Sequence, residues 1–321
     1  MSSDKKSTNG LISKNSFDIS TFENNKYIKA ATSENTRKAY QSDIKHFENN
    51  GGKLPANPHQ IAMYLQQYAE NLNPRTLSRR LTAIKNWHVY QGFTDPTAHP
   101  AIIKTISGIN RLHGKPKQKA YPLSPKDLFK IVSYLHNEGS IAAIRDSALL
   151  QVGYFGAFRR SELVAIKVED ITFKDQGAEV ILMGSKTDQE NQGQYVALAF
   201  GKDKLCPVKA LNNWLDKAKI HNGSIFRGIN KKGIILNNQL TPLSVNIILK
   251  RRAAEAGIKN IKNLSSHSLR RGLATYASLA GADVTAIMRQ GRWKQINTVM
   301  EYIEASARFS ENVASKILEC L

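Results

Sequence analysis

Cysteine is scarce in this chain: its 321 residues include two, Cys206 and Cys320, which lie far apart in the sequence. Two isolated thiols form neither a disulfide framework nor a cysteine-based metal site. The eight histidines show no HExxH motif or other paired spacing that would hold a catalytic metal. We therefore expect a protein that works without a metal or another cofactor.

Long apolar runs are also missing. A membrane-spanning helix needs roughly 18 apolar residues, and the longest candidate, residues 147–158, is shorter and is bounded by Asp146 and Arg159. The amino terminus, MSSDKKSTNG, lacks the apolar core of a signal peptide. These absences predict a soluble protein of the cytoplasm that has no membrane partner.

Acidic residues are in deficit. Lysine and arginine number 46 against 26 aspartates and glutamates, which gives a formal net charge of +20. Such an excess implies a polyanionic partner, either nucleic acid or an anionic membrane surface. Because no membrane segment is present, the charge favours nucleic acid.

The chain is long enough for two domains. Residues 1–16 are polar and predict a disordered tail. Residues 17–110 predict a small domain of four or five helices, with Asn73–Pro74 and Asp95–Pro96 as helix starts. Apolar residues recur there at i, i+4, i+7 in four stripes: Tyr40, Ile44 and Phe47; Ile61, Leu65 and Tyr68; Leu77, Leu81 and Ile84; Ile102, Ile106 and Ile109.

A basic linker is predicted over residues 111–123. Its segment RLHGKPKQKAYP carries four basic residues, two prolines and no acid. It is either a solvated connector or a strap that lies along a phosphate backbone. Ser124, followed by Pro125 and Asp127, begins a capping box, so the second domain is expected to span residues 124–321.

The second domain is predicted to be mostly helical with one β insert. Residues 168–173, 179–184 and 195–200 have the composition of three short antiparallel strands, and the helices resume after them up to the carboxyl terminus. The fold class expected is therefore mainly α, with a small three-stranded antiparallel β insert, in two domains.

Three short stretches carry the residue types of a phosphate-handling site. In GAFRRSEL (156–163), Arg159 and Glu162 stand at i, i+3, which taken alone is typical of an ion pair on a solvated face. In SSHSLRRG (265–272), His267 and Arg270 share a helix face, and an arginine fork matches phosphate oxygens. In GRWKQINTVMEYI (291–303), Tyr302 is either a packing residue or a nucleophile.

Together these stretches resemble the tyrosine recombinase (phage integrase) family over nearly the whole chain. SENTRKAYQSDIKHF (33–47) resembles part of the family's core-binding domain, and residues 124–321 resemble its catalytic domain. MGSKTD (183–188) resembles the turn that carries the catalytic lysine, and GRW has tryptophan where most members have histidine and Cre-type members have tryptophan. The resemblance assigns catalytic roles to Arg159, Lys186, His267, Arg270, Trp293 and Tyr302, with Glu162 in support.

The resemblance implies a site-specific DNA recombinase. The two arginines would clamp the non-bridging phosphate oxygens, Lys186 would protonate the leaving 5′ oxygen, and Tyr302 would hold the DNA as a 3′-phosphotyrosine. Two rounds of cleavage and ligation through a Holliday junction would then integrate, excise or resolve DNA. The implied partners are double-stranded DNA with paired recombination sites and a homotetramer linked through the carboxyl-terminal helix, residues 307–321.

Several points stay open at this level. Trp293 can only donate a hydrogen bond and cannot shuttle a proton. The neighbours Arg160 and Arg271 leave open which arginine of each pair contacts phosphate. Two alternative functions are a type IB topoisomerase-like enzyme and a catalytically silent DNA-binding protein. The DNA sequence recognised and any accessory proteins are not indicated by the sequence.

One helix of the first domain is a candidate for DNA binding. Arg75 and Arg79 share with Thr82 the face opposite the apolar stripe that begins at Leu77. We expect this face to enter or border a groove of the DNA, although a basic face that is only solvated is also common. The candidate DNA-contacting residues are Arg75, Arg79 and Lys85 on this helix, with Lys115 and Lys117 in the linker.

Overall fold

The structure is a computed structural model that describes residues 26–116, 118–183, 193–307 and 313–318. The chain divides between residues 117 and 118 into two compact units, which are taken separately below. The fold class predicted from the sequence is confirmed: the chain is mainly helical and carries a small three-stranded antiparallel sheet. No helix in the described ranges combines the length and the apolar character that a membrane crossing requires.

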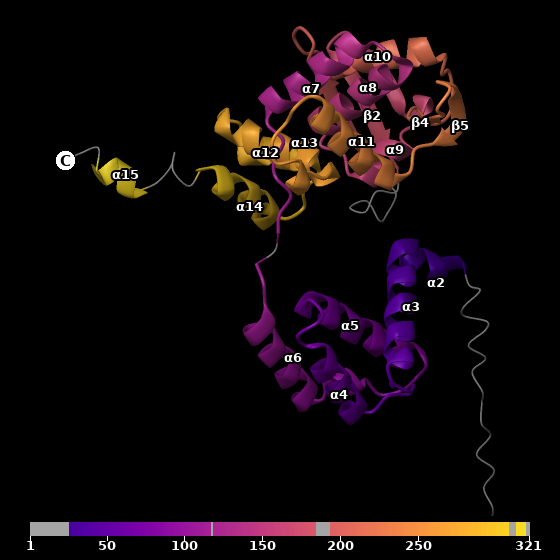
Figure 1. Ribbon diagram of the computed structural model, residues 1–321, viewed down its shortest axis with the longest axis vertical. Helices are drawn as coiled ribbons and strands as arrows, with labels where there is room; N and C mark the ends of the chain where they lie inside the picture. The colour runs from indigo at the N-terminus through magenta and orange to yellow at the C-terminus, as the bar shows by residue number, and fades with distance from the viewer. Residues whose placement is uncertain (1–25, 117, 184–192, 308–312, 319–321) are drawn as a thin grey trace, which may run out of the picture. The chain divides into compact units, whose positions relative to one another are not determined.

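The first unit is helical throughout its described part (Figure 1). Asn73 accepts a hydrogen bond from the backbone N–H of Arg75 at 2.9 Å, so this predicted helix start is confirmed. The elements are α2 (Lys26–Ala31), α3 (Glu34–Asn49), α4 (Pro58–Tyr68), α5 (Pro74–Tyr90), the 3-10 helix η1 (Pro96–Ala98) and α6 (Pro100–His113).

The helix start predicted at Asp95–Pro96 is only partly right. Asp95 caps the short helix η1, and α6 begins five residues after Asp95, at Pro100. The residue before a proline is disfavoured in the helical region. His99 is accordingly extended, with ψ 133°, and interrupts the helix before α6 can begin.

The core of the first unit joins the four predicted stripes. The residues of these stripes that are buried in it are Phe47, Ile61, Leu65, Leu77, Ile84, Ile102 and Ile109. A polar network lies beside this core and ties α3 to α5. The Asp43 carboxylate, 2% exposed, accepts hydrogen bonds from Nε and Nη2 of Arg79 at 2.8 Å each, and Arg80 donates to the Tyr64 hydroxyl at 2.6 Å.

The second unit builds helices around one central helix, α8 (Figure 1). Its elements up to the sheet are α7 (Pro125–Glu138), α8 (Ile141–Phe155), α9 (Arg160–Ala165), the 3-10 helix η2 (Val168–Asp170), β1 (Ile171–Lys174), β2 (Gly177–Leu182) and β3 (Gln194–Ala199). They are followed by α10 (Pro207–Ala218), β4 (Arg227–Ile229), β5 (Ile235–Gln239), α11 (Pro242–Glu255), η3 (Ile261–Asn263), α12 (Ser266–Leu279), α13 (Val284–Gly291), α14 (Ile296–Ala307) and α15 (Val313–Leu318).

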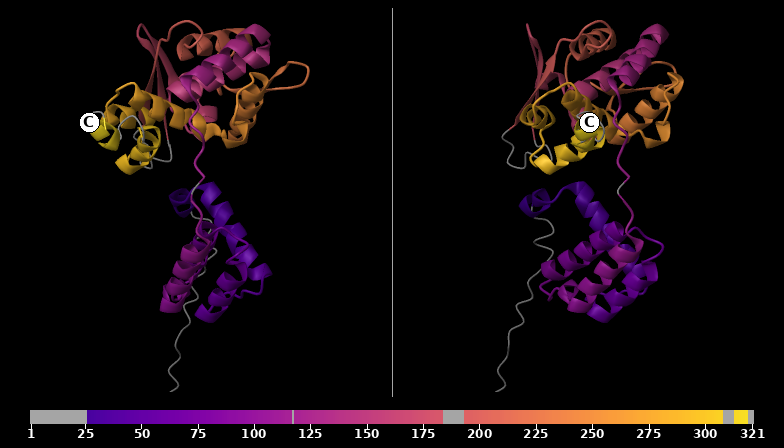
Figure 2. Two further views of the ribbon diagram at one scale, coloured as in Figure 1. Left: turned by 60° about the vertical axis from the view of Figure 1, so that its left-hand side comes forward. Right: turned by 90° about the vertical axis from the view of Figure 1, so that its left-hand side faces the viewer.

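The three-stranded sheet lies at one edge of this unit (Figure 2). Its order is β1-β2-β3, and Val180 of β2 stands opposite Ile171 and Val196 in an antiparallel register. The strand predicted over residues 168–173 is wrong in its first half. Lys167 donates its backbone N–H to the carboxylate of Asp170 at 2.8 Å, and this cap folds residues 168–170 into η2.

A second sheet was not predicted. β4 and β5 form an antiparallel hairpin after α10, where the sequence analysis expected only helices. The two strands are short, and β5 is almost wholly exposed along ILNNQ. A polar, exposed pair of this length has no period-2 apolar alternation, so the pattern that reveals strands was absent.

Most of helix α8 is buried, including the polar residues Arg145, Asp146 and Gln151. Asp146 is fully buried and accepts hydrogen bonds from Arg145 at 2.6 Å, from Arg252 at 2.7 Å and from Arg251 at 3.0 Å. This ion cluster ties α8 to α11. On another side of the unit's core, the indole of Trp214 on α10 donates to the carbonyl of Ile225 at 2.7 Å.

Helix α12 is seated against the segment that leads into the second unit. Leu123 donates its backbone N–H to the carbonyl of Ser268 at 3.0 Å. A Cβ at Gly272 would stand 2.3 Å from the Leu123 carbonyl oxygen and 2.7 Å from a ring carbon of Tyr154. The lack of a side chain at Gly272 therefore lets α12 approach both the chain before α7 and α8.

Replacing Gly272 by alanine should destabilise the second unit by about 1–3 kcal/mol, because backbone must move to make room. Gly108 is the matched control. It lies within α6 with no atom within 4 Å of an added Cβ, so Gly108→Ala should stabilise its helix by about 0.5–1 kcal/mol. Urea unfolding of both variants measures the difference, and equal effects would contradict the close approach of α12.

Candidate active site

The site begins at the turn that follows α8. Arg159 donates its backbone N–H to Glu162 at 2.9 Å and its Nη1 to the other carboxylate oxygen at 2.5 Å. The i, i+3 pair is therefore present, but it does not lie on a solvated face: Glu162 is 7% exposed. Arg160, the neighbour that left the sequence ambiguous, is exposed at the start of α9, so Arg159 is the arginine that the buried carboxylate holds.

A second arginine, Arg292, holds the same carboxylate. It is buried and donates Nη2 to Glu162 at 2.9 Å, and it also donates to the carbonyls of Gly156 at 3.0 Å and Ala157 at 3.2 Å. The sequence analysis missed this residue, although it stands inside the GRW motif. Arg292 adopts a left-handed conformation, φ 57°, after the last turn of α13, and its side chain folds back toward α9. No residue pattern in the sequence predicts this fold-back.

Arg270 lies over the indole of Trp293. Its guanidinium carbon is 4.2 Å from the ring centroid, and its Nη1 donates to the carbonyl of Ala157, which Arg292 also contacts. Arg270 is 4% exposed, and its Nη2 has no hydrogen-bond partner among the residues that the structure describes. A buried, charged N–H group without an acceptor costs free energy, which an anion arriving at this point would recover.

The electrostatics of the cluster follow from burial and proximity. Burial lowers the pKa of Arg270 to about 9, and the positive charges of Arg159 and Arg292 act in the same direction. For Glu162, burial would raise the pKa. The charge of Arg292 and the hydrogen bonds from Arg159 outweigh burial and hold that pKa below its ordinary value of 4.5. At neutral pH the site therefore holds one carboxylate among three cations.

Tyr302 contacts the same indole, Trp293, over which the Arg270 guanidinium lies. The two aromatic rings are 5.9 Å apart at 66°, an edge-to-face contact. A small apolar cluster, in which Val299 and Ile303 are buried, seats α14 against α12 and α13. Thr275 of α12 donates its hydroxyl to the Tyr302 carbonyl at 3.3 Å. Tyr302 is thus half-buried at a defined place beside the arginines.

Arg271 connects the same tyrosine to the linker segment. Its guanidinium carbon lies 5.0 Å from the Tyr302 ring centroid, and its Nη1 donates to the carbonyl of Ala120. Lys119 pairs with Glu301 at 3.0 Å, one residue before the tyrosine. Of the two neighbouring arginines, Arg270 therefore faces Arg159 and Trp293, whereas Arg271 faces the tyrosine ring and the linker.

The remaining predicted catalytic and linker residues are placed as follows. His267 is exposed on the first turn of α12, three residues before Arg270. Lys186 and Lys117 lie outside the residues that the structure describes. Lys115 is exposed just after α6. The structure therefore brings together Arg159, Glu162, Arg270, Trp293 and Tyr302, and it leaves Lys186 unplaced.

The predicted DNA-binding face of α5 divides into two kinds of residue. Arg75 is exposed. Arg79 is clamped by Asp43 through two hydrogen bonds while its side chain stays 51% exposed, and Lys85 pairs with Asp95 at 3.5 Å. Arg79 therefore has a structural role within the first unit in addition to any contact with DNA.

This arrangement favours a phosphate-type anion. Arginine forks bind tetrahedral oxyanions through several hydrogen bonds at once, and the tyrosine hydroxyl is the nucleophile type next to them. Within the described ranges, no group of three histidine, cysteine or acidic side chains is placed to hold a metal. A tyrosine beside a cluster of arginines is an arrangement suited to attack on a phosphate ester.

Comparison with known proteins gives the family. The sequence model described as "Phage integrase family" matches residues 122–308, and "Phage integrase, N-terminal SAM-like domain" matches residues 19–91. An integrase/recombinase XerD homolog of Selenomonas ruminantium is 36% identical, over 90% of this chain and 87% of that protein. The Cre recombinase of Escherichia phage P1 is 26% identical, over 79% and 78%. The chain belongs to the phage integrase family and is a tyrosine recombinase.

A solved structure shares the fold. The XerH site-specific recombinase bound to a palindromic difH substrate matches with a TM-score of 0.61 at 19% identity, covering 87% of this chain and 80% of that one. Identity at this level supports the two-domain architecture alone. The match agrees with the mainly helical fold and small sheet described above.

Replacing Glu162 by glutamine should destabilise the second unit by about 3–5 kcal/mol, because buried cations lose their carboxylate. The lowered pKa means that the stabilisation is present above pH 4.5 and is lost as pH falls through the lower folded-state pKa. The gap between wild type and Glu162→Gln should therefore close in acid.

The matched control is Glu179→Gln, which removes a partly exposed ion pair with Lys174, N–O distance 2.7 Å, and should cost about 0–1 kcal/mol. Urea unfolding from pH 3 to 7 measures both. Equal losses, or a Glu162→Gln gap that does not change with pH, would contradict the ion cluster described here.

Proposed function

We propose that this tyrosine recombinase cleaves and rejoins double-stranded DNA at paired specific sites, with Tyr302 as its nucleophile. The observation that carries the proposal is a chain of contacts that starts at Glu162, which holds Arg159 and Arg292. Arg292 shares the Ala157 carbonyl with Arg270, and Arg270 stacks on Trp293, which contacts the Tyr302 ring. The unpaired N–H group of Arg270 marks the point at which a phosphate oxygen would bind. The net charge of +20 supplies the attraction to DNA.

The chemistry divides among few residues. The Tyr302 oxygen attacks phosphorus, a phosphotyrosine ester forms at the 3′ end, and the bond to the 5′ oxygen breaks. The phenol releases its proton to water, the 5′ oxygen takes one from the Lys186 ammonium, and Lys186 regains one from water, so protons balance across the step. Arg159 and Arg270 stabilise the charge that develops on the non-bridging oxygens, with His267 and Trp293 as further donors. Removing one such donor typically costs about 10²–10³ in rate.

Rejoining reverses the same step. One phosphate ester replaces another, so the bond energy is retained and no ATP is consumed. A 5′ hydroxyl from the partner duplex attacks the phosphotyrosine, and two such rounds pass through a Holliday junction. The arginines supply the positive charge that phosphoryl transfer requires, and for that reason the proposal includes no cofactor.

A type IB topoisomerase-like enzyme would use the same tyrosine chemistry, and a silent DNA binder would use none. The similarity to the XerD homolog over 90% of this chain, including the helical first unit, favours recombination. The presence of a tyrosine next to the arginine cluster disfavours a silent binder. The work of such an enzyme places the protein in the cytoplasm at the nucleoid.

A homotetramer on DNA would place four such sites around two duplexes. Ile317 and Leu318 of α15 are 60% and 70% exposed, and an apolar helix end of this kind needs a cover. Phe309 of the predicted carboxyl-terminal helix, residues 307–321, lies outside the described residues, as does the side chain of Val313. A groove of about 720 Å³ beside the sheet, lined in part by Phe155, Leu198 and Leu273, is an apolar receiver for the carboxyl-terminal helix of a neighbouring copy.

Replacing Tyr302 by phenylalanine should abolish covalent attachment to DNA and leave binding nearly unchanged, because only the nucleophilic oxygen is removed. Nicked fragments of source DNA are incubated with protein, denatured with SDS, and scored for protein attached at the 3′ side. Tyr195→Phe is the matched control, since Tyr195 is an exposed tyrosine of the same unit on β3. Attachment that survives Tyr302→Phe, or is lost equally in the control, would refute the assignment.

Replacing Arg75 by alanine should weaken DNA binding across all sequences and reduce the salt slope by about 1, as expected for one lost phosphate contact. Arg75 is a cleaner probe than Arg79, whose removal would also leave the buried Asp43 carboxylate without its bidentate partner. The control variant is Lys104→Ala, which replaces an exposed lysine on α6. Titrations at several salt concentrations measure both variants, and an unchanged slope for Arg75→Ala would remove α5 from the DNA interface.

A further inference from the structure

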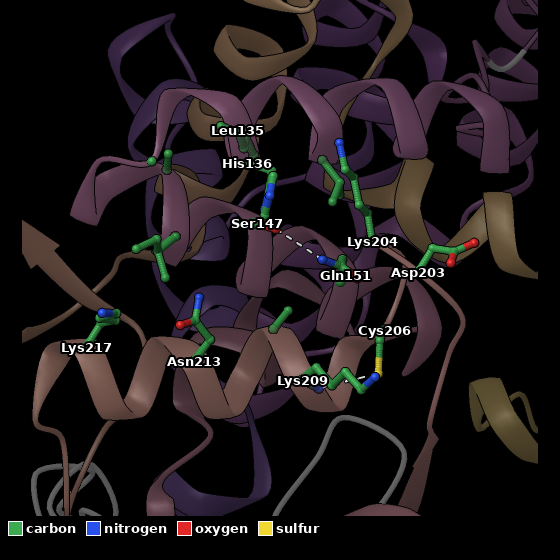
Figure 3. Close-up of a pocket in the computed structure, with 15 residues that line it drawn as sticks. Leu135, His136, Ser147, Gln151, Asp203, Lys204, Cys206, Lys209, Asn213 and Lys217 are labelled. Carbon is green, nitrogen blue, oxygen red and sulfur yellow. Dashed lines mark hydrogen bonds between the residues drawn. The ribbon is translucent and has the colours of Figure 1, made fainter.

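A groove lies on the second unit between α7 and α10, with α8 as its floor (Figure 3). Both α7 and α10 pack on α8, and between them they leave a cavity of about 420 Å³ that is open to solvent on one side. The floor is a stripe of α8 at helical spacing, formed by Ile144, Ser147 and Gln151. None of the residues placed in the candidate active site lines this groove.

The floor holds an unpaired polar atom. Gln151 is 1% exposed, and its Nε2 donates to the Ser147 hydroxyl at 3.1 Å, as Figure 3 shows. Its Oε1 is buried and has no hydrogen-bond partner among the described residues. A buried acceptor without a donor costs free energy. Gln151 lines the groove, and a rotation of its side chain toward the groove would let a bound donor recover that free energy.

The walls are apolar and the rim is cationic. Val132 and Leu135 of α7 line one wall. On α10, Lys209 and Lys217 stand on one stripe facing the groove, and Lys204 lies at its end (Figure 3). All three lysines are exposed, and the one acidic residue of the lining is Asp203.

We propose that this groove binds an acidic peptide segment of a partner protein, anchored by a tyrosine or tryptophan. Such a side chain has an apolar body for the walls and one donor at its tip for Gln151 Oε1, and aromatic anchors of this kind dominate peptide interfaces. Carboxylates that flank the anchor would meet the lysines of the rim.

The shape argues for a peptide over other anions. A DNA backbone presents phosphates on a broad convex surface, and it cannot lower a hydrogen-bond donor onto the recessed amide of Gln151. A small molecule is usually enclosed over most of its surface, whereas this groove is open on one side. A chain segment that places one side chain in the recess and continues along the rim satisfies both features.

The groove and the candidate active site are lined by different residues, so binding in the groove is separate from DNA cleavage. Gln151 lies on the same helix whose carboxyl end leads into the Gly156–Arg159 turn, but the residues of that turn do not line the groove. A partner docked here would touch the catalytic unit without covering Tyr302. The inference therefore stands independently of the catalytic role proposed for that tyrosine.

The test is a selection of displayed random peptides on the full-length protein, with duplex DNA present as competitor. Lys209→Glu/Lys217→Glu serves for counter-selection. Selected peptides should be acidic with a central tyrosine or tryptophan, and replacing that residue by alanine should weaken them at least about tenfold, which corresponds to about 1.4 kcal/mol. Fluorescence anisotropy of labelled peptides measures each affinity.

Three variants make the result specific. The lysine reversal and Gln151→Met, which removes the amide but keeps the length of the side chain, should each weaken the selected peptides at least about tenfold. Lys219→Glu, an exposed lysine at the end of α10 that does not line the groove, should leave binding unchanged. DNA binding and covalent attachment should be unaffected in all three variants, and thermal unfolding verifies that each is folded.

Other outcomes overturn the proposal. If no peptide is enriched on wild type over the lysine reversal, the groove is not a peptide site. If the selected peptides lack acidic residues or bind Gln151→Met as tightly as wild type, the anchor assigned here is wrong. If duplex DNA displaces the peptides, the lysines belong to a DNA-binding surface instead.

Discussion

The site depends on one buried carboxylate. Three arginine side chains lie close together in the second unit, and like charges at this separation would drive them apart without a counter-charge. Glu162 supplies it by binding Arg159 and Arg292 directly, and Arg270 is held next to them through the carbonyl of Ala157. One negative charge among three positive ones leaves the cluster short of anions, and a phosphate diester is the group that would complete it.

The backbone around this cluster is arranged to bring distant segments together. Ala157 adopts φ 45° and Arg292 φ 57°, so the turn after α8 and the end of α13 both use left-handed residues. At Ala157 this conformation lets the backbone carbonyl accept hydrogen bonds from Arg270 and Arg292. At Arg292 it directs the side chain back to Glu162. Trp293 then joins Arg270 to Tyr302. Arg271 contacts both the ring of that tyrosine and the carbonyl of Ala120, so it connects the proposed nucleophile indirectly to the predicted linker.

Helix α8 organises the second unit on more than one side. Its carboxyl end leads into the arginine turn, its buried Asp146 binds arginines of α11, and its uncovered stripe forms the floor of the groove between α7 and α10. The carboxylate oxygens of Asp146 accept hydrogen bonds from neighbouring arginines, whereas Oε1 of Gln151 has no hydrogen-bond partner among the described residues. That difference separates a structural ion cluster from a place where another molecule can bind.

The sequence by itself determined the helical character of both units, the start of α5 at Asn73, the three-stranded insert and the residue types of the site, because periodicity, caps and short motifs are local properties. Tertiary structure decided the rest. The exposed β4–β5 hairpin has no alternation to reveal it, and His99 divides a predicted helix start because Pro100 follows. Arg292 joins the site through a fold-back that no spacing encodes, and Arg270 and Arg271, adjacent in sequence, face different partners because they leave α12 about 100° apart. Whether a polar side chain is buried with a partner, as Glu162 is, or without one, as at Gln151 Oε1, depends on segments far away in the chain, and only the folded arrangement brings those segments into contact.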